Sequence, residues 1–300
     1  MNNRSKLRHH SRLYLKQQRW GYLFILPWFA GVLVFLAWPL LQSFYFSLCT
    51  VKITGSGRFY EWVGLQNYIY IWAKDIYYLR RLLNFIINTA LQLPIILVFS
   101  MMIALLLNIR LPGRGFFRTI FFLPVIIVSG PLISELTAQG VTTIPLVSEY
   151  GIYQSITGIL PLWIADPITM LFSQLIMILW YSGIQILIFI AGLHKIDNSM
   201  NEAAKIDGAT GWEIFWKITL PQLRPMILIN GIYTLVFLAN SEQNDIIYLI
   251  SNNMLNPSSG YGYASAMAWM HTVTVIILLL LVWLWCRERQ PQSHIKKSVR

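Results

Sequence analysis

The sequence predicts an all-α membrane protein with six transmembrane helices. Apolar residues make up 56% of the 300 positions and charged residues only 12%, which is about half the charge of an ordinary soluble domain. The charges are missing from long continuous stretches, and several of these exceed the roughly 20 residues that a helix needs to cross the hydrocarbon. The stretches lack the alternation of a membrane-spanning β-strand, so helices are the remaining way to satisfy the backbone in lipid.

Six spans are expected from the apolar runs of the sequence. They lie near 20–48, 84–108, 118–137, 168–193, 226–250 and 264–286. Two of them are irregular: prolines and a glycine interrupt the third span, and the fifth contains Glu242 and Asp245.

The distribution of positive charge predicts the orientation of the chain. Eighteen of the 23 Lys and Arg residues fall in the two ends and in the segments after the second and fourth spans, and five fall in 49–83. Because positive charge favours the cytoplasmic side, both termini are expected there, which an even number of spans allows. The organisation is then a basic cytoplasmic tail (1–19), a transmembrane domain (20–286) and a second basic tail (287–300).

The sequence offers no chemistry that would make the chain an enzyme. It contains no G-x-x-x-x-G-K-[ST] phosphate loop, no HExxH and no CxxC, and its five histidines are scattered. Gly55-Ser56-Gly57 is too short for a dinucleotide loop. The net charge of +11 is explained by the orientation signals and by contact with membrane lipid, so no nucleic-acid partner is expected. No cofactor or metal is expected in this chain.

The segment 194–225 is the largest expected cytoplasmic loop, and it reads as two short helices. Ser199-x-x-Glu202 has the form of a capping box, which predicts a helix start near Met200. Gly208 is the natural stop, since glycine takes the left-handed conformation at low cost.

A second helix is predicted from about Gly211 to Thr219. Pro221 and Pro225 are then expected to redirect the chain into the fifth span. Taken alone, this pattern fits a simple linker between two spans as well as a docking helix.

The segment resembles the EAA loop of binding-protein-dependent ABC importer permeases. The family pattern is E-A-A, three residues, G, nine residues and I-x-L-P. The sequence has Glu202-Ala203-Ala204, then Gly208, then Ile218-Thr219-Leu220-Pro221, with every spacing met, and Asp207 precedes the glycine as in the sugar-importing branch. Shorter segments of that branch also match, at 24–27, 64–68, 121–124, 191–193, 247–249 and 262–266. The sequence departs from the family in its short 251–261 segment and in lacking the large extra outer domain of some maltose-type permeases.

The resemblance implies the type I permease fold and a coupling helix at 199–208, in which five residues couple to the ATPase: Glu202, Ala203, Ala204, Asp207 and Gly208. This helix would lie in a cleft of a cytoplasmic ATPase subunit. The implied partners are two such ATPases, which bind ATP and Mg, an extracytoplasmic solute-binding protein and a second permease chain of different sequence. The implied location is the bacterial inner membrane.

Two polar patches inside the spans are candidates for binding an oligosaccharide. Matching the fourth and fifth spans to the maltose-type permeases places Tyr181, Ser182, Gln185 and Asn240 at positions that line the sugar site. Glu242 joins them because a carboxylate inside a membrane is costly and usually functional. Serine and glutamine can also simply tie helices together, and Glu242 can simply reach water.

The spans contain no Lys or Arg beyond their ends, which favours a neutral saccharide over an anion such as a glycerol phosphate. A glycerol-phosphate permease is one alternative to the sugar importer. A self-sufficient secondary transporter is another, with Glu135, Glu242 and Asp245 as its only candidates for an ion site.

Overall fold

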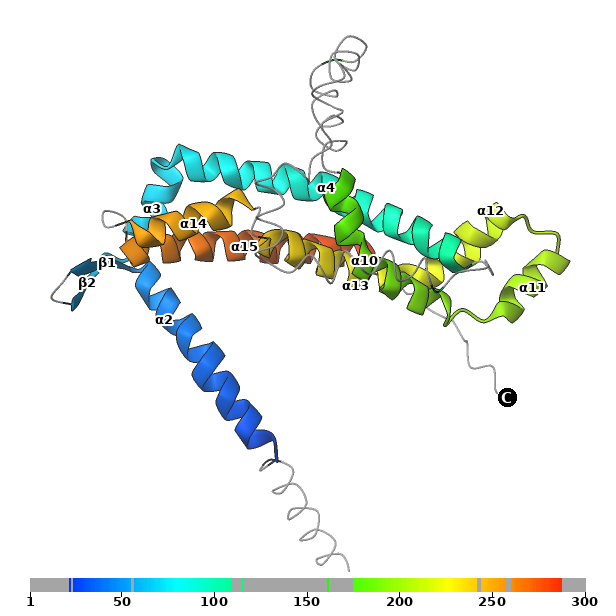
Figure 1. Cartoon of the computed structure of the whole chain (residues 1–300), viewed down its shortest axis with the longest axis horizontal. Coiled ribbons are helices and arrows are strands. Elements are labelled where there is room, and N and C mark those ends of the chain that lie inside the picture. The colour runs from blue at the N-terminus through cyan, green and yellow to red at the C-terminus, as the bar shows by residue number, and fades with distance from the viewer. Residues whose placement is uncertain are drawn as a thin grey trace, which may run out of the picture. The chain divides into compact units, whose positions relative to one another are not determined.

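The computed structural model describes residues 22, 24–54, 57–108, 115, 161, 175–241, 244–256 and 260–287 (Figure 1). The third predicted span lies outside these residues, as do the first tail, nearly all of the second and the start of the fourth span. In chain order the elements are η1 (Leu33–Ala37), α2 (Trp38–Ser47), β1 (Cys49–Thr54), β2 (Gly57–Trp62), α3 (Gln66–Ala73), α4 (Ile76–Asn108), α10 (Leu175–Leu193), α11 (Asn198–Ile206), α12 (Gly211–Ile214), η2 (Phe215–Thr219), α13 (Leu220–Asn240), α14 (Asp245–Leu255) and α15 (Gly260–Cys286).

The helical membrane class is confirmed. Among the described residues, four helices are long and apolar enough to cross a membrane: Phe24–Ser47, Ile76–Asn108, Gly211–Asn240 and Gly260–Cys286. The apolar helix α10 covers the described part of the fourth predicted span. The second span begins at Ile76 and not near residue 84, because the helix continues through Arg80 and Arg81, whose charges set the predicted start.

The fifth span differs most from the prediction. Pro221 and Pro225 do not redirect the chain, because Pro221 occupies the first turn of α13, where a missing N–H is tolerated, and Pro225 lies inside a helix that continues. The helix ends at Ser241, whose backbone is extended. A separate helix, α14, follows where the sequence suggested one continuous span.

Two π-helical turns, η1 and η2, occur in the described chain, and each precedes a proline by the same offset. Pro39 and Pro221 stand two residues after the turns end. The first N–H after each turn donates to the carbonyl five residues back, from Trp38 to Leu33 and likewise in η2. A proline ring in a regular helix collides with the carbonyl four residues earlier, so a wider turn at this place relieves the collision.

The chain divides into two compact units, described here one at a time: Met1–Ile76 with Ile250–Met270, and Tyr77–Leu249 with His271–Arg300. In the first unit, α2 leads into an antiparallel hairpin in which Cys49 pairs with Trp62. This hairpin was not predicted from the sequence, although glycines at 55 and 57, between a β-branched stretch and an aromatic one, are a turn signal.

Close backbone contacts hold the hairpin in the first unit. The side-chain amide of Asn67 in α3 donates to the carbonyls of Ser47 (2.9 Å) and Cys49 (3.2 Å). In α15, a Cβ on Gly262 would overlap the Cys49 carbonyl, and one on Gly260 would overlap the Val51 carbonyl. Glycine is therefore required at both positions for α15 to lie against β1.

The second unit has its core where α4, α10 and α13 meet. α10 packs along α13, and Gly192 permits the approach, because a Cβ there would overlap the side chain of Met226. The buried residues of this cluster are Leu97, Ala104, Leu107, Ile186, Phe189, Ile190, Leu193 and Leu223. The α11–α12 segment leaves this core after α10 and returns to it through η2 (Figure 1).

Candidate coupling and transport sites

The helix α11 begins earlier than predicted and is capped by a different residue. Asp197 is its N-cap, and its carboxylate accepts a hydrogen bond from the backbone N–H of Ser199 at 3.0 Å. The predicted capping box of Ser199 and Glu202 is therefore wrong, because Asp197, two residues before Ser199, is the cap and accepts from the N–H of the second helical residue. As a result, Glu202 takes no part in a cap, and it is exposed.

The predicted end of this helix is confirmed. Gly208 has a φ of +81°. Its N–H donates to the carbonyl of Lys205 (3.1 Å), and the N–H of Ala209 donates to the carbonyl of Ala204 (2.9 Å). These two bonds form a Schellman motif, which satisfies carbonyls that the helix end would leave free.

The predicted coupling residues lie on a largely exposed helix. Glu202, Ala203, Asp207 and Gly208 are exposed and Ala204 is half-buried. Their neighbour Ile206 is 86% exposed, which is unusual for a large apolar side chain at the end of a short polar helix. In the described structure α11 is therefore a short helix that is capped at both ends and has mostly exposed side chains.

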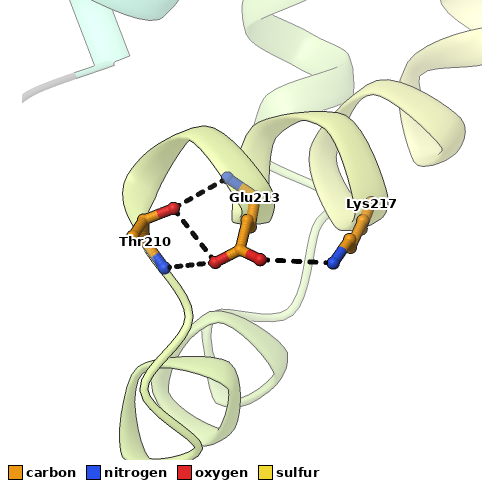
Figure 2. A network of polar contacts seen from close by, with 3 residues as sticks. All are labelled: Thr210, Glu213 and Lys217. Carbon is orange, nitrogen blue, oxygen red and sulfur yellow. Dashed lines mark hydrogen bonds and ion pairs between the residues drawn. The ribbon is translucent and has the colours of Figure 1, made fainter.

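The next helix, α12, holds the capping box that was predicted one helix too early. Figure 2 shows Thr210, whose hydroxyl accepts from the N–H of Glu213 (3.3 Å) while the Glu213 carboxylate accepts from the N–H of Thr210 (3.0 Å). Lys217 lies one turn on, 3.3 Å from the same carboxylate. These contacts connect the N-cap of α12 with η2, in the segment between α11 and α13.

Backbone hydrogen bonds lower the pKa of both capping carboxyls. The N–H of Ser199 does this for Asp197, and the N–H of Thr210, with help from Lys217, does it for Glu213. A lowered pKa means that the folded loop favours the ionised form. The stabilisation is therefore present above the ordinary carboxyl pKa and is lost as the pH falls through the lowered one.

Three predicted substrate residues on α10 are buried in this structure. Gln185 is fully buried, and its amide donates to the hydroxyl of Thr234 on α13 at 2.9 Å. Ser182 is also buried and donates to the carbonyl of Ile178 in its own helix. Tyr181 packs edge to face on Phe237 of α13, with ring centroids 4.8 Å apart.

The remaining predicted substrate residues belong to the end of α13 and beyond. Asn240 is exposed, and its amide donates back to the carbonyl of Val236 at 2.8 Å. Glu242 lies outside the described residues. The structure thus brings Gln185, Ser182 and Tyr181 together at the α10–α13 contact.

Sequence reasoning missed the polar partners on α13. Asn230 donates to the backbone carbonyl of Gln185 at 3.2 Å, and Thr234 receives the Gln185 side chain. Both are fully buried. Their spacing of four residues in an otherwise apolar helix is the signal that could have found them, since it puts both on one face.

The fold and the polar contacts between its helices define a multi-span helical membrane protein. Residues 77–286 match the family described as "Binding-protein-dependent transport system inner membrane component". The chain belongs to this family, whose members are transport components and not enzymes.

Relatives of known description support the assignment. The chain is 32% identical to the lactose transport system permease protein of Rhizobium radiobacter, over 71% of this chain and 70% of that protein. It is 34% identical to the trehalose/maltose transport system permease protein of Thermococcus litoralis, over 73% of each.

A solved structure shares the fold. A chain of the bacterial alginate ABC transporter, crystallised with its alginate pentasaccharide-bound periplasmic protein, superposes with a TM-score of 0.61 at 18% identity, covering 91% of this chain and 96% of that one. The predicted permease fold is confirmed at this level.

Proposed function

We propose that this chain is one permease subunit of an ATP-driven importer for an oligosaccharide. It forms half of a membrane pathway, and a second, different permease chain forms the other half. An extracytoplasmic binding protein delivers the sugar, and two cytoplasmic ATPase subunits bind ATP and Mg. Both termini and α11 lie on the cytoplasmic side of the bacterial inner membrane, as the distribution of positive charge indicates.

The geometry of α11 is the observation that carries the coupling role. Its two ends are fixed by Asp197 and by the turn at Gly208, so a force on the helix moves it as one body. Its surface offers the Glu202 carboxylate and the apolar side chain of Ile206 together. A cleft with a cation beside an apolar pocket is the complementary surface, which fits an ATPase subunit that closes on ATP.

The relatives support a saccharide as the substrate. The two compared by sequence above are named for lactose and for trehalose and maltose. The spans carry Lys and Arg only near their ends, so the pathway through this chain favours a neutral or mostly neutral sugar. Amide and hydroxyl groups are the partners that sugar hydroxyls require.

We assign the sugar contacts to Tyr181, Ser182, Gln185, Asn240 and Glu242. The buried state of Gln185 and Ser182 fits a pathway that is closed at the α10–α13 contact. Opening that contact exposes the two side chains, and alternating access requires such an exchange between two arrangements.

Charge reversal on α11 tests the coupling role. Glu202→Lys places a cation where the ATPase is expected to offer one, so the purified permease should recruit little ATPase and uptake should fall at least tenfold. Co-purification of the ATPase and ATP-driven uptake in vesicles measure both effects. Glu61→Lys, an equal charge reversal on β2, is the control and should leave ATPase recruitment unchanged. Normal recruitment and uptake by the Glu202 variant would contradict the coupling role.

The substrate class needs its own measurement. Vesicles that contain the whole transporter should take up a di- or trisaccharide only when the binding protein and internal ATP are both present. Uptake driven by an ion gradient without ATPase would instead establish a secondary transporter. Uptake of glycerol phosphate in preference to sugar would overturn the saccharide assignment.

A further inference from the structure

His271 is a buried imidazole in the last helix, α15, that the transport scheme above does not use. The side chain is 6% exposed and lies edge to face against the ring of Phe85 on α4, with ring centroids 4.9 Å apart. At 1.5 Å per residue it stands about 22 Å from the Cys286 end of α15, so it falls within a hydrocarbon layer of about 30 Å. An ionisable side chain at that depth calls for an explanation.

The imidazole binds a backbone carbonyl of another helix. Its Nε2 lies 3.1 Å from the carbonyl oxygen of Ala239, close to the end of α13. Since a carbonyl only accepts, Nε2 carries the proton, and the Nδ1 of the neutral ring is left as an acceptor. Nδ1 is buried without a hydrogen-bond partner in the described structure. The hydrogen bond to the Ala239 carbonyl thus offsets part of the free-energy cost of burying this polar ring.

The same carbonyl has a second donor. The side-chain amide of Asn244 donates to the Ala239 oxygen at 2.9 Å, and the side-chain oxygen of Asn244 accepts from the N–H of Ile246 at 3.0 Å. Asn244 therefore caps the end of α13 and the start of α14 at once. His271 reaches the same point from α15.

These bonds surround the place where the fifth span stops. The backbone at Ser241 is extended, and α14 begins only at Asp245. In lipid, a helix end leaves carbonyls that water cannot satisfy, and such ends are found where protein groups replace the missing bonds. Interrupted helices in transporters also stand next to the substrate, because they turn polar groups toward the pathway.

We propose that His271 is a positioning residue that holds the end of α13, and with it Asn240, in place for the transported saccharide. The inference rests on the proposed function, because it assigns to His271 the placement of a sugar contact in that same pathway. The imidazole acts through the Ala239 carbonyl and touches no substrate itself.

The test compares two variants in the complete transporter with its binding protein and ATPase. His271→Leu keeps the volume of the side chain but removes the donor. His271→Gln retains an amide N–H at a reach similar to that of Nε2. The saccharide transported per ATP hydrolysed should fall several-fold in the leucine variant, the size expected when the Ala239 carbonyl loses one of its two side-chain donors and keeps Asn244. The glutamine variant should recover most of it.

A purely structural role predicts a different outcome. Poor folding or assembly would lower ATP hydrolysis and uptake together and leave their ratio unchanged, and glutamine would not rescue it. Equal ratios in wild type and the leucine variant would overturn the proposal. Val273→Leu, an exposed position on α15, is the matched control and should behave as wild type.

Hydrogen exchange supplies a readout that does not depend on the sugar. In His271→Leu, the backbone amides from Asn244 to Tyr248 should exchange faster, since their helix start loses its fixed neighbour, while those of 225–235 should not change. Adding Asn244→Asp removes the second donor and should enlarge the effect beyond the sum of the single changes. If the wild type transports no saccharide but exchange still responds, the proposed function fails and the positioning role of His271 in the fold survives. Unaltered exchange overturns that role as well.

Discussion

Gly208 shows how much one residue decides in the loop between the fourth and fifth spans. Its φ of +81° ends α11, and the two hydrogen bonds of the Schellman motif depend on that conformation. Any other L-residue would adopt it only at a cost of about 1–2 kcal/mol. The direction in which the chain leaves the end of α11 is therefore set by the backbone conformation of this single residue.

Gly208→Ala should loosen this turn and lower ATP-driven uptake several-fold at normal expression. A Cβ at this position meets nothing within 4 Å, so the effect comes from backbone strain alone. Gly211→Ala is the matched control, since Gly211 opens α12 with an ordinary φ and equally open surroundings. Uptake assays on both variants decide the matter: equal activity would mean that the left-handed turn does not matter for coupling.

For single residues, the sequence predicted the features that depend only on neighbouring residues in the chain. Gly208 was predicted correctly because the preference of glycine for a left-handed helix end needs no knowledge of the fold. The cap at Ser199 was predicted wrongly because Asp197 competes for the same N–H groups, and only the path of the chain selects between them. The burial of Gln185 could not be predicted, since it depends on which face of α13 lies opposite.

The π-helical turns are the feature that stands out among the elements. Both precede a proline by the same offset, and the wide turn gives the proline ring room, although Pro94 and Pro225 lie inside helices without such a turn. The turn η2 also lies between α12 and α13, and it contains Lys217, which links it to Glu213 and Thr210 at the start of α12 (Figure 2). It therefore fixes the rotation of α11 and α12 about the axis of α13.

Pro221→Ala should convert η2 into an ordinary helical turn by restoring an N–H and removing the ring. The wide turn holds one residue more than an ordinary turn. When that residue joins the regular helix, the segment before it rotates by about 100° about the helix axis. ATPase recruitment and uptake should then fall together, although insertion into the membrane is unchanged. Pro225→Ala, in the same helix but without a π-turn before it, is the control. Equal activities of the two variants would contradict a role for the turn.

Among the elements, hydropathy was a good guide to where helices lie and a poor guide to where they stop. The start of α15 was predicted to within four residues, because glycines mark the beginning of its apolar run. The fifth span was placed about six residues late at its start and ten at its end. Neither feature is a matter of hydropathy. The continuation through Pro221 depends on the backbone of the first turn of α13 and the π-turn before it, and the break after Asn240 is accompanied by the hydrogen bonds of Asn244 and His271 to the Ala239 carbonyl.

For the molecule as a whole, the central expectation is the sidedness of the loops. A cysteine at Ile206 on α11 should react with an impermeant maleimide only from the cytoplasmic side, and a cysteine at Glu61 on β2 only from the opposite side. Cys286 would be replaced by serine, while Cys49 is buried and can be kept. Labelling of inside-out and right-side-out vesicles measures this. The reverse pattern would overturn the assigned orientation and the ATPase contact with it.

The backbone contact between β1 and the start of α15 has a consequence for exchanging parts among relatives. The family match begins at Tyr77, yet the carbonyls of Cys49 and Val51 lie where any side chain on Gly262 or Gly260 would be. A chimera joined at residue 77 would therefore set a foreign strand against this pair of glycines. The first 76 residues and the start of the last helix need to come from the same parent.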